Sequence, residues 1–315
     1  MKKKLPDFTL KFLAAFLILL FVSINIFAQS DSLTVVNTKW EIKKVSPGIK
    51  LKHYWFNQSL FGCNQNINIL EIKLNHRNKI DVEGEPKILK PASAFGTSDA
   101  ALAVLNGTFF DMKNGGSEDY IRIDGKTLNK TRVGKMNKRA LHQKAAIVIK
   151  DGKVAIKEWD GSQNWEDQLT GEDVMVTGPM LLNDRTREKL DSTSMYTARH
   201  PRTAVALKGN KILLITVDGR NKRAAGMSLY ELASLLKWLK ADDGINLDGG
   251  GSTTLWVKGF PDGGVINHPS DNKAMMKSDS YKPGMDLDNL AADDKKWDHA
   301  GERSVANVIL VNKKK

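Results

Sequence analysis

Two segments of the chain share a strand–turn–strand pattern, and this pattern limits the possible folds more than any other feature. The first, AAIVIKDGKVAIKEWDG, begins at Ala145, and the second, TAVALKGNKILLITVDG, begins at Thr203. Each has an apolar run, a short turn with glycine, and a second run that ends in Asp-Gly. This pattern predicts β-hairpins with turns at Asp151-Gly152 and Gly209-Asn210. We interpret the likeness as a recurring hairpin and not as a duplication.

The outgoing strand of the second hairpin, KILLITVD, is apolar on both faces, which predicts a place in the middle of a sheet. Asp218 would then lie where a central strand reaches solvent. Further strands are predicted from INILEIKL at Ile67, ALAVLNG at Ala101, INLD at Ile245 and SVANVILV at Ser304. Many strands with few helices predict an α+β fold, a single domain built on a mixed, strand-rich β-sheet.

One helix is predicted from SLYELASLLKWLK, which begins at Ser228 and has Glu231 at the capping-box spacing. In a helix its leucines share one apolar face: Leu229, Leu232, Leu235, Leu236 and Leu239. The helix should end near Asp242, after which INLD brings Asp248 to the end of a second strand. Asp218 and Asp248 are therefore expected at the ends of separate strands.

The first 28 residues are predicted to be a signal peptide, with a basic start, an apolar stretch and a cleavage position near Ala28. An uncleaved membrane anchor is the alternative, which the short stretch and its interruption by Ser23 and Asn25 disfavour. Residues 29–40 are interpreted as a tail and 41–315 as the domain. Within that domain the polar segment 272–300 is interpreted as a surface insertion.

Cys63 is the sole cysteine, so the chain can form no internal disulfide. Export without disulfides fits the periplasm or cell surface of a bacterium. The net charge is +12, and loss of the leader's four lysines and one aspartate leaves +9. A basic protein attracts polyanions such as phosphate-bearing glycans, and a membrane surface is a further possible partner, whereas export disfavours nucleic acid. A lysine-rich soluble surface explains the charge equally well.

The stretch GINLDGGGSTTLWV places three glycines directly after Asp248. Consecutive glycines can turn successive backbone N–H groups toward one point and so bind an anion, and the hydroxyl groups that follow add donors. The candidate binding residues here are Gly249, Gly250, Gly251 and Ser252. A tight turn between closely packed backbones is the alternative, although three glycines exceed what a turn needs.

Arginines recur beside the predicted strand ends: Arg202 in HPRTAV, Arg220 in VDGR and Arg303 in GERSV. An arginine can hold a phosphate through two hydrogen bonds, although most arginines in a basic chain are solvated surface groups. The segment LNGTFFD adds Asn106 and Thr108 as candidates, with an ordinary Asn-Gly turn as the alternative.

Other chemical signals are weak, and no metal or cofactor is predicted. The histidines lack metal-ligand spacing, and the sequence has no phosphate-binding loop, nucleophile elbow or dinucleotide fingerprint. We interpret His142, His200 and His268 as structural or exposed.

Several of these segments, in this order, resemble the phosphodiester glycosidase family. The matching pieces are LNGTFFD, TGPMLL, HPRTAVAL, LLITVDGR with GMSLYELASLLKWL, INLDGGGSTTL, VINHPSD and GERSVANVILV. The resemblance extends from Gly48 to Val311, and NLDGGGS is its most specific part. LLNDRTREKLD lacks a glycine usual in that turn, and the segment between Asn272 and Ala300 looks like an insertion that could reshape the rim of the site.

The resemblance implies hydrolysis of a sugar-1-phosphodiester to a free sugar and a phosphomonoester. It also implies a set of pocket residues. Most of them are already candidates from the pattern of the sequence, and Asn267 is new: Asn106, Arg202, Asp218, Arg220, Asp248, Gly249, Gly250, Gly251, Ser252, Asn267 and Arg303.

The chemistry agrees with that implication. A phosphate leaving group needs charge neutralisation, which arginines and a glycine loop supply, and the sugar carbon needs a carboxylate and an activated water. Asp248 is the first candidate for general base or nucleophile, Asp218 the second, and Glu302 a reserve in the pocket. Two alternatives remain, namely a non-catalytic binder of phosphorylated cell-surface glycans and a metal-dependent phosphodiesterase that uses both aspartates.

Overall fold

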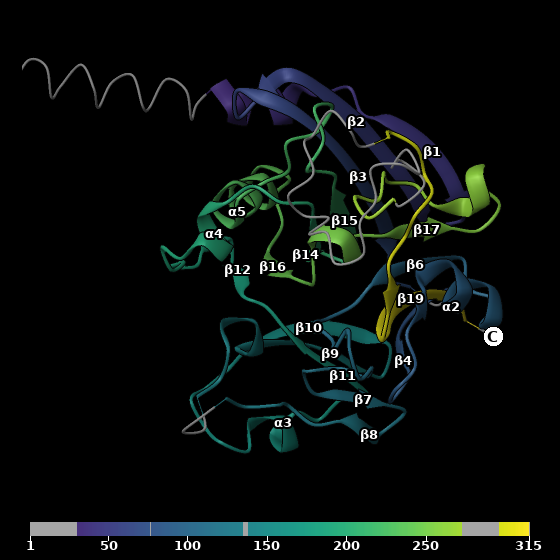
Figure 1. Ribbon diagram of the computed structural model, residues 1–315, viewed down its shortest axis with the longest axis vertical. Coiled ribbons are helices and arrows are strands. Elements are labelled where there is room, and N and C mark those ends of the chain that lie inside the picture. Colours follow the sequence, from purple (N-terminus) through teal and green to yellow (C-terminus); the bar gives the residue numbers. More distant parts are fainter. Residues whose placement is uncertain (1–29, 76, 135–137, 273–295, 315) are drawn as a thin grey trace, which may run out of the picture.

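The computed structural model describes residues 30–75, 77–134, 138–272 and 296–314, and it consists mainly of strands with a few short helices (Figure 1). The predicted α+β class and the strand-rich architecture are confirmed. The predicted leader and most of the predicted insertion lie outside the described residues. Among the described residues, no helix is both long and apolar enough to cross a membrane.

The largest sheet has eight strands and carries the candidate site at one edge. Its neighbouring strands pair antiparallel throughout. In spatial order they are β1 (Glu41–Ser46), β2 (Ile49–Leu60), β3 (Cys63–Lys73), β15 (Lys211–Val217), β14 (Arg202–Lys208), β16 (Asp243–Asn246), β12 (Met180–Asn183) and β13 (Thr186–Arg187). Because β15 and β16 are both antiparallel to β14, their last residues point to the same edge of the sheet.

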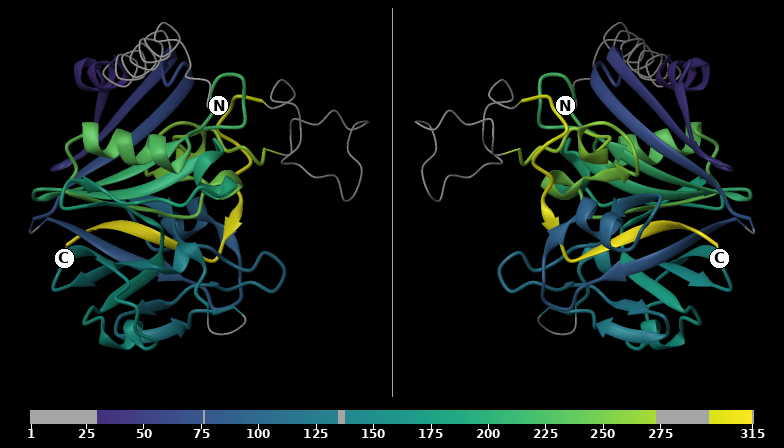
Figure 2. Two further views of the ribbon diagram at one scale, coloured as in Figure 1. Left: turned by 90° about the vertical axis from the view of Figure 1, so that its left-hand side faces the viewer. Right: turned by 90° about the vertical axis from the view of Figure 1, so that its right-hand side faces the viewer.

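The other strands form three smaller sheets. The five-stranded sheet contains β10 (Lys153–Glu158), β9 (Ala145–Lys150), β11 (Asp173–Thr177), β7 (Ile121–Ile123) and β8 (Lys126–Asn129). The four-stranded sheet contains β17 (Leu255–Val257), β6 (Ala103–Asn106), β19 (Asn307–Lys313) and β4 (Asn78–Gly84), and the two-stranded sheet contains β18 (Ser304–Val305) and β5 (Lys90–Pro91). Figure 2 shows β4 and β19 between the eight-stranded sheet and the five-stranded sheet. The strands therefore divide among several sheets, and all pairings between the described strands are antiparallel.

Both predicted hairpins are confirmed. β9 pairs with β10 and β14 pairs with β15, each with its strands antiparallel and joined by two residues. Asp151 and Gly152 have positive φ angles of 51° and 70°, as a two-residue hairpin turn requires. The two hairpins belong to different sheets, so their similar sequences serve different parts of the core.

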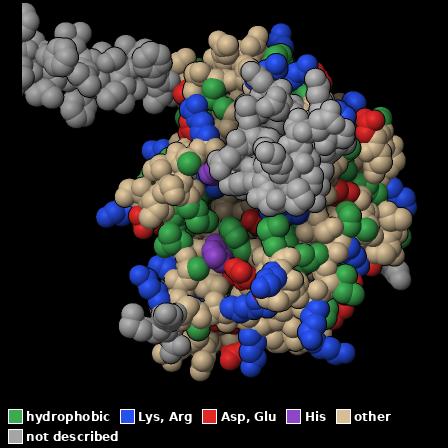
Figure 3. All heavy atoms as spheres, viewed as in Figure 1, with side chains coloured by type: hydrophobic (Ala, Val, Ile, Leu, Met, Phe, Trp, Pro, Cys, Tyr) green, Lys and Arg blue, Asp and Glu red, His purple; other side chains and the backbone are tan. Residues whose placement is uncertain are grey.

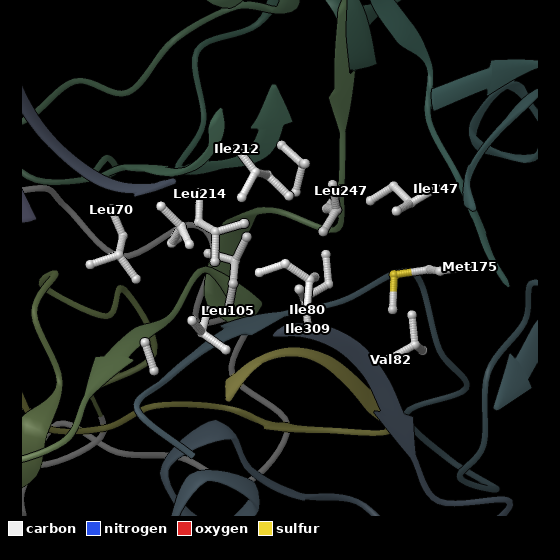
Figure 4. Close-up of a cluster of buried hydrophobic side chains, with 14 of the residues drawn as sticks. Leu70, Ile80, Val82, Leu105, Ile147, Met175, Ile212, Leu214, Leu247 and Ile309 are labelled. Atoms are coloured by element: carbon white, nitrogen blue, oxygen red, sulfur yellow. The ribbon is translucent and has the colours of Figure 1, made fainter. Parts of the chain in front are cut away.

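The central place predicted for β15 is also confirmed, because it lies between β3 and β14. Its side chains alternate between two cores: Ile212 and Leu214 join one cluster, whereas Leu213 and Ile215 join the other. Figure 4 shows the first cluster, in which Ile212 and Leu214 lie with Leu105 of β6. The two-sided burial explains why this strand has no polar face.

Helix α5 (Leu229–Trp238) covers the second core. It begins with the predicted capping box, because Ser228 Oγ accepts from Glu231 N and Glu231 Oε2 accepts from Ser228 N. Residues 30–37 are helical, and Val35 is buried in the same core, so part of the predicted tail packs against the domain. The remaining helices are short: α2 (Ala92–Ser98), α3 (Trp165–Gln168), α4 (Ser194–Thr197), η2 (Leu141–Gln143), η3 (Gly250–Ser252) and η4 (Asp262–Gly264).

Candidate active site

The ends of three adjacent strands define the candidate site. Asp218 follows β15, Asp248 follows the end of β16 by two residues, and Arg202 begins β14 between them. The strands therefore bring these three residues to one edge of the eight-stranded sheet. Figure 3 shows the face of the molecule that is turned toward the viewer in Figure 1. It has a hollow near its middle, with acidic, basic and histidine side chains around it.

Asp248 is held by its backbone and surrounded by groups that change its ionisation. Its N–H donates to Gly107 O at 3.1 Å, and its carbonyl accepts from Asn106 Nδ2 at 2.7 Å. Burial raises the pKa of Asp248 to about 6, although the Ser252 hydroxyl, the Arg303 charge and His142 all oppose this increase. Its carboxyl group therefore changes charge close to neutral pH, as a general base or nucleophile should.

The three glycines form a tight turn against two arginines. Gly250 has a φ of 60°, and a Cβ atom there would lie 3.1 Å from the Arg220 guanidinium. A Cβ atom on Gly251 would overlap the side chains of Asp271 and Arg303. The turn therefore needs glycine so that its backbone can approach both guanidinium groups.

The amides of this turn are less available to an anion than the sequence suggests. Gly250 N donates to Pro201 O at 2.9 Å, and Ser252 N and Thr253 N donate to carbonyls within the turn at 3.2 and 3.3 Å. Ser252 Oγ is buried, and its interaction with the Asp248 carboxyl group lowers the pKa of that group. An anion at this turn would therefore depend chiefly on the neighbouring arginines.

We expect Gly251→Ala to weaken the site without unfolding the protein. The added methyl group must displace Arg303 or Asp271, so turnover should fall by at least about tenfold, equivalent to about 1.4 kcal/mol in the barrier. Gly134→Ala is a matched control, because its φ is not positive and its Cβ atom would come no closer than 3.3 Å to another group. Steady-state kinetics and thermal unfolding of both variants test this. Full activity of Gly251→Ala would show that the close approach is unnecessary.

The three predicted arginines have different surroundings. Arg303 Nε donates to Asp271 Oδ2 at 2.6 Å, and its charge lowers the pKa of Asp248. Arg220 has a φ of 57°, and its Nη2 lies 3.4 Å from His200 Nδ1. Arg220 and Arg303 flank the glycine turn and are the two arginines placed to meet an anion there.

Arg202 is fixed by backbone carbonyl groups. Its guanidinium donates to Met227 O at 2.7 Å and to the carbonyls of Met195 and Ala198, both at 2.9 Å. Burial, with a contribution from the nearby Arg220 charge, lowers the pKa of Arg202 to about 10. These contacts anchor the start of β14 to two segments. One precedes β14 and contains Met195 and Ala198, and the other precedes α5 and contains Met227.

Asn106 and Thr108 connect loops of the site through buried hydrogen bonds. Asn106 Oδ1 accepts from Thr203 Oγ1 at 2.9 Å and from Thr254 N at 3.0 Å, so it joins β6 to the glycine turn and to β14. Thr108 Oγ1 donates to Asp119 Oδ2 at 2.6 Å. These hydrogen bonds hold the loop that contains Gly107, whose carbonyl accepts from the backbone N–H of Asp248.

Asn267 and Glu302 also make local structural contacts. Asn267 Oδ1 accepts from Leu255 N and its Nδ2 donates to Thr253 O, both at 2.8 Å. Glu302 accepts from Ser93 N at 3.1 Å and from Ser93 Oγ, at the beginning of α2. The structure thus brings Asp248, Arg220, Arg303 and the glycine turn together and places Asp218 at the same edge of the sheet. The contacts of Glu302 lie at the start of α2.

Two histidines that we interpreted from the sequence as structural or exposed lie beside carboxylates. His142 Nε2 lies 3.3 Å from Asp119 Oδ1, and its ring stacks on Phe109 with centroids 4.1 Å apart. Burial opposes protonation of His142, but Asp119, with smaller contributions from Glu118 and Asp248, raises its pKa overall. His142 and Asp119 both lie outside the strands and have no motif spacing, so no local signal in the sequence indicates that they pair.

The second histidine, His268, pairs with Asp218 and borders a cavity. His268 Nδ1 lies 2.9 Å from Asp218 Oδ2. The cavity has a volume of about 250 Å³ and is lined in part by His53, His268, His299, Asn68 and Phe260. Among the described residues, no group of three or more His, Cys, Asp or Glu side chains is arranged to hold a metal ion.

A carboxylate of raised pKa beside two arginines, at the edge of an antiparallel sheet, fits an enzyme that acts on a phosphate ester. The chain belongs to the phosphodiester glycosidase family, whose family model matches residues 99–312. A 74-residue segment is also 36% identical to the SPβ prophage-derived uncharacterized protein YomE of Bacillus subtilis. That segment covers 23% of this chain and only 11% of the length of YomE.

Solved structures share the fold. The catalytic domain of zebrafish N-acetylglucosamine-1-phosphodiester α-N-acetylglucosaminidase, auto-inhibited by its pro-peptide, matches with a TM-score of 0.60 and 20% identity. The match covers 87% of this chain and 88% of that chain. A hypothetical protein from Synechocystis matches with a TM-score of 0.56 and 15% identity, over 87% of this chain and 64% of that chain.

Proposed function

We propose that the protein is an exported hydrolase that cleaves a sugar-1-phosphodiester into a free sugar and a phosphomonoester. The observation that carries this proposal is Asp248, whose pKa is raised to about 6 beside Arg303 and the glycine turn. A passive binder of phosphate esters would have no need for a carboxylate poised to change charge at that position. Family membership and the shared fold support the same reaction class.

The site divides into parts that suit the two halves of such a substrate. Arg220 and Arg303 neutralise the phosphate, which leaves as a stabilised anion and needs little help from a general acid. Asp248 faces the sugar carbon as general base or nucleophile, where positive charge develops in the transition state. A small molecule or a polymeric phosphoglycan could supply this ester.

A panel of sugar-1-phosphodiesters that differ in the sugar and in the alcohol tests the proposal. We expect release of free reducing sugar from at least one member, starting with N-acetylglucosamine derivatives. Activity that survives a chelator would exclude the metal-dependent alternative. Tight binding of every ester with no release of sugar would favour the non-catalytic binder instead.

We propose export because the basic start and apolar stretch of the first 28 residues have the pattern of a cleaved leader. Mass spectrometry of the protein from its native host should find an N-terminus near Gln29. A mature pool that retains Met1 would contradict export by this route.

A further inference from the structure

Asp218 is a buried carboxylate, and among the described residues its side chain accepts hydrogen bonds from two, Asn66 and His268. Its side chain has no solvent exposure. Oδ1 accepts the backbone N–H of His268 at 3.1 Å, whereas Oδ2 accepts from Asn66 Nδ2 at 2.7 Å and lies 2.9 Å from His268 Nδ1. Both oxygens are therefore fixed, and the carboxylate has a definite orientation toward the imidazole ring.

This contact defines which nitrogen of His268 can take up a proton. An ionised carboxylate only accepts hydrogen bonds, so this contact favours a proton on Nδ1, and a neutral ring then keeps its lone pair on Nε2. Asn66 Nδ2 also lies 3.4 Å from Nδ1, but it makes a shorter hydrogen bond, 2.7 Å, to Asp218 Oδ2. Among the described residues, none hydrogen-bonds to Nε2. The ring plane is held by Trp297, which stacks on it with centroids 3.8 Å apart and an angle of 11°. The side chain is 14% exposed, so a small molecule can reach it.

The segment that carries His268 also carries a residue of the phosphate side of the site. Asn267 is pinned to the residues that follow the glycine turn, and Asp271 pairs with Arg303 over Gly251. His268 therefore lies on a short segment that runs between Asp218 and Arg303. This places the ring at the same edge of the sheet as the arginines.

The cavity beside His268 offers a polar place for water. Asn68 lines it, is buried, and its side-chain amide hydrogen-bonds no described residue. With a volume of about 250 Å³, the cavity has room for water together with part of a substrate. A water molecule there could meet the lone pair of a histidine, whereas both polar side-chain atoms of Asn68 are inaccessible to water.

We propose that His268, oriented by Asp218, accepts the proton of the water that attacks the sugar carbon. This inference rests on the proposed function. The water oxygen forms a bond to the anomeric carbon as its proton passes to Nε2. The bond from that carbon to the phosphate oxygen breaks, and its electron pair leaves with the phosphomonoester. The imidazolium then releases the proton to solvent. Asp218 is a positioning residue in this scheme. Because His268 is the base and water the nucleophile, the scheme narrows the role of Asp248 to stabilising the positive charge that develops on the sugar carbon.

Substitution combined with chemical rescue tests the proton transfer. We expect His268→Gln to lower kcat by at least about a hundredfold while it keeps an amide that can donate to Asp218. His268→Ala should lose as much, and added imidazole should restore part of its kcat. His299→Gln is the matched control, since His299 lines the same cavity but its recorded polar contact is with Asn267 O, so imidazole should not increase its activity. Wild-type kcat in His268→Gln would overturn the proposal, as would a lack of rescue in folded His268→Ala.

A readout without substrate separates this inference from the proposed function. Nitrogen NMR of histidine-labelled full-length protein should show the Nδ1–H tautomer for His268, and Asp218→Asn should abolish that preference because an amide can donate as well as accept. If the wild type cleaves no sugar-1-phosphodiester, the proposed function fails whereas the tautomer still tests the pair. An Nε2–H tautomer in the wild type would overturn the proposal whatever the substrate.

Discussion

Asp248→Asn is expected to abolish turnover while it leaves affinity for the phosphate ester within about tenfold, or about 1.4 kcal/mol. The substitution keeps the size of the side chain and removes its charge. Loss of a general base or nucleophile should slow the reaction by at least about a hundredfold. Release of reducing sugar measures turnover, and calorimetry with a phosphomonoester product measures affinity.

Arg303→Ala gives the contrasting result that makes this prediction specific. Arg303 would hold the phosphate in both the bound state and the transition state, so its loss should weaken binding and turnover together. Wild-type turnover in Asp248→Asn would assign that aspartate a structural role. The chemistry would then rest with Asp218 and His268, or the non-catalytic binder would become the better description.

The sequence predicts the core of this site because strand ends can be read locally. The alternation and apolar runs of β14, β15 and β16 identify three strands, and Asp218 and Asp248 follow two of them. The antiparallel pairing of β14 with both neighbours then brings the two aspartates to the same edge. The division into several sheets was not predictable in this way, because the partner of a strand depends on contacts between distant residues.

Individual side chains show where local patterns stop being informative. Arg202, Arg220 and Arg303 look equivalent in the sequence, yet Arg202 donates to three backbone carbonyls whereas the other two flank the glycine turn. His142 lies in the short helix η2 and His268 in a connecting segment, and their carboxylate partners come from positions 23 and 50 residues away. No periodicity relates such pairs, so only the folded chain reveals them.

The pH dependence of the reaction should follow the ionisation of Asp248. If the carboxylate is the active form, kcat/KM should rise with pH through about 6 and level off above that value. Below this midpoint the rate should fall by about tenfold for each pH unit. Because the Arg303 charge lowers the pKa of Asp248, Arg303→Met should move the rise to higher pH. Arg187→Met is the control, since Arg187 lies on the edge strand β13 and its recorded partner is Ser234.

Stability should depend on pH in the opposite direction. The pKa of Asp248 is raised from 3.8 to about 6 on folding, so its contribution to stability is present below 3.8 and is lost as pH rises through about 6. Asp248→Asn removes this loss and should be more stable than the wild type at pH 8 by about 3 kcal/mol. The difference should shrink toward pH 4, where both side chains are neutral. Urea unfolding at pH 8 and pH 4 measures the difference in unfolding free energy. An Asp248→Asn variant that is less stable than the wild type at pH 8 would show that the carboxylate is well paired in the folded protein. The same desolvation that makes Asp248 a reactive base would then no longer be a cost to the fold, and the assignment of its role would have to rest on kinetics alone.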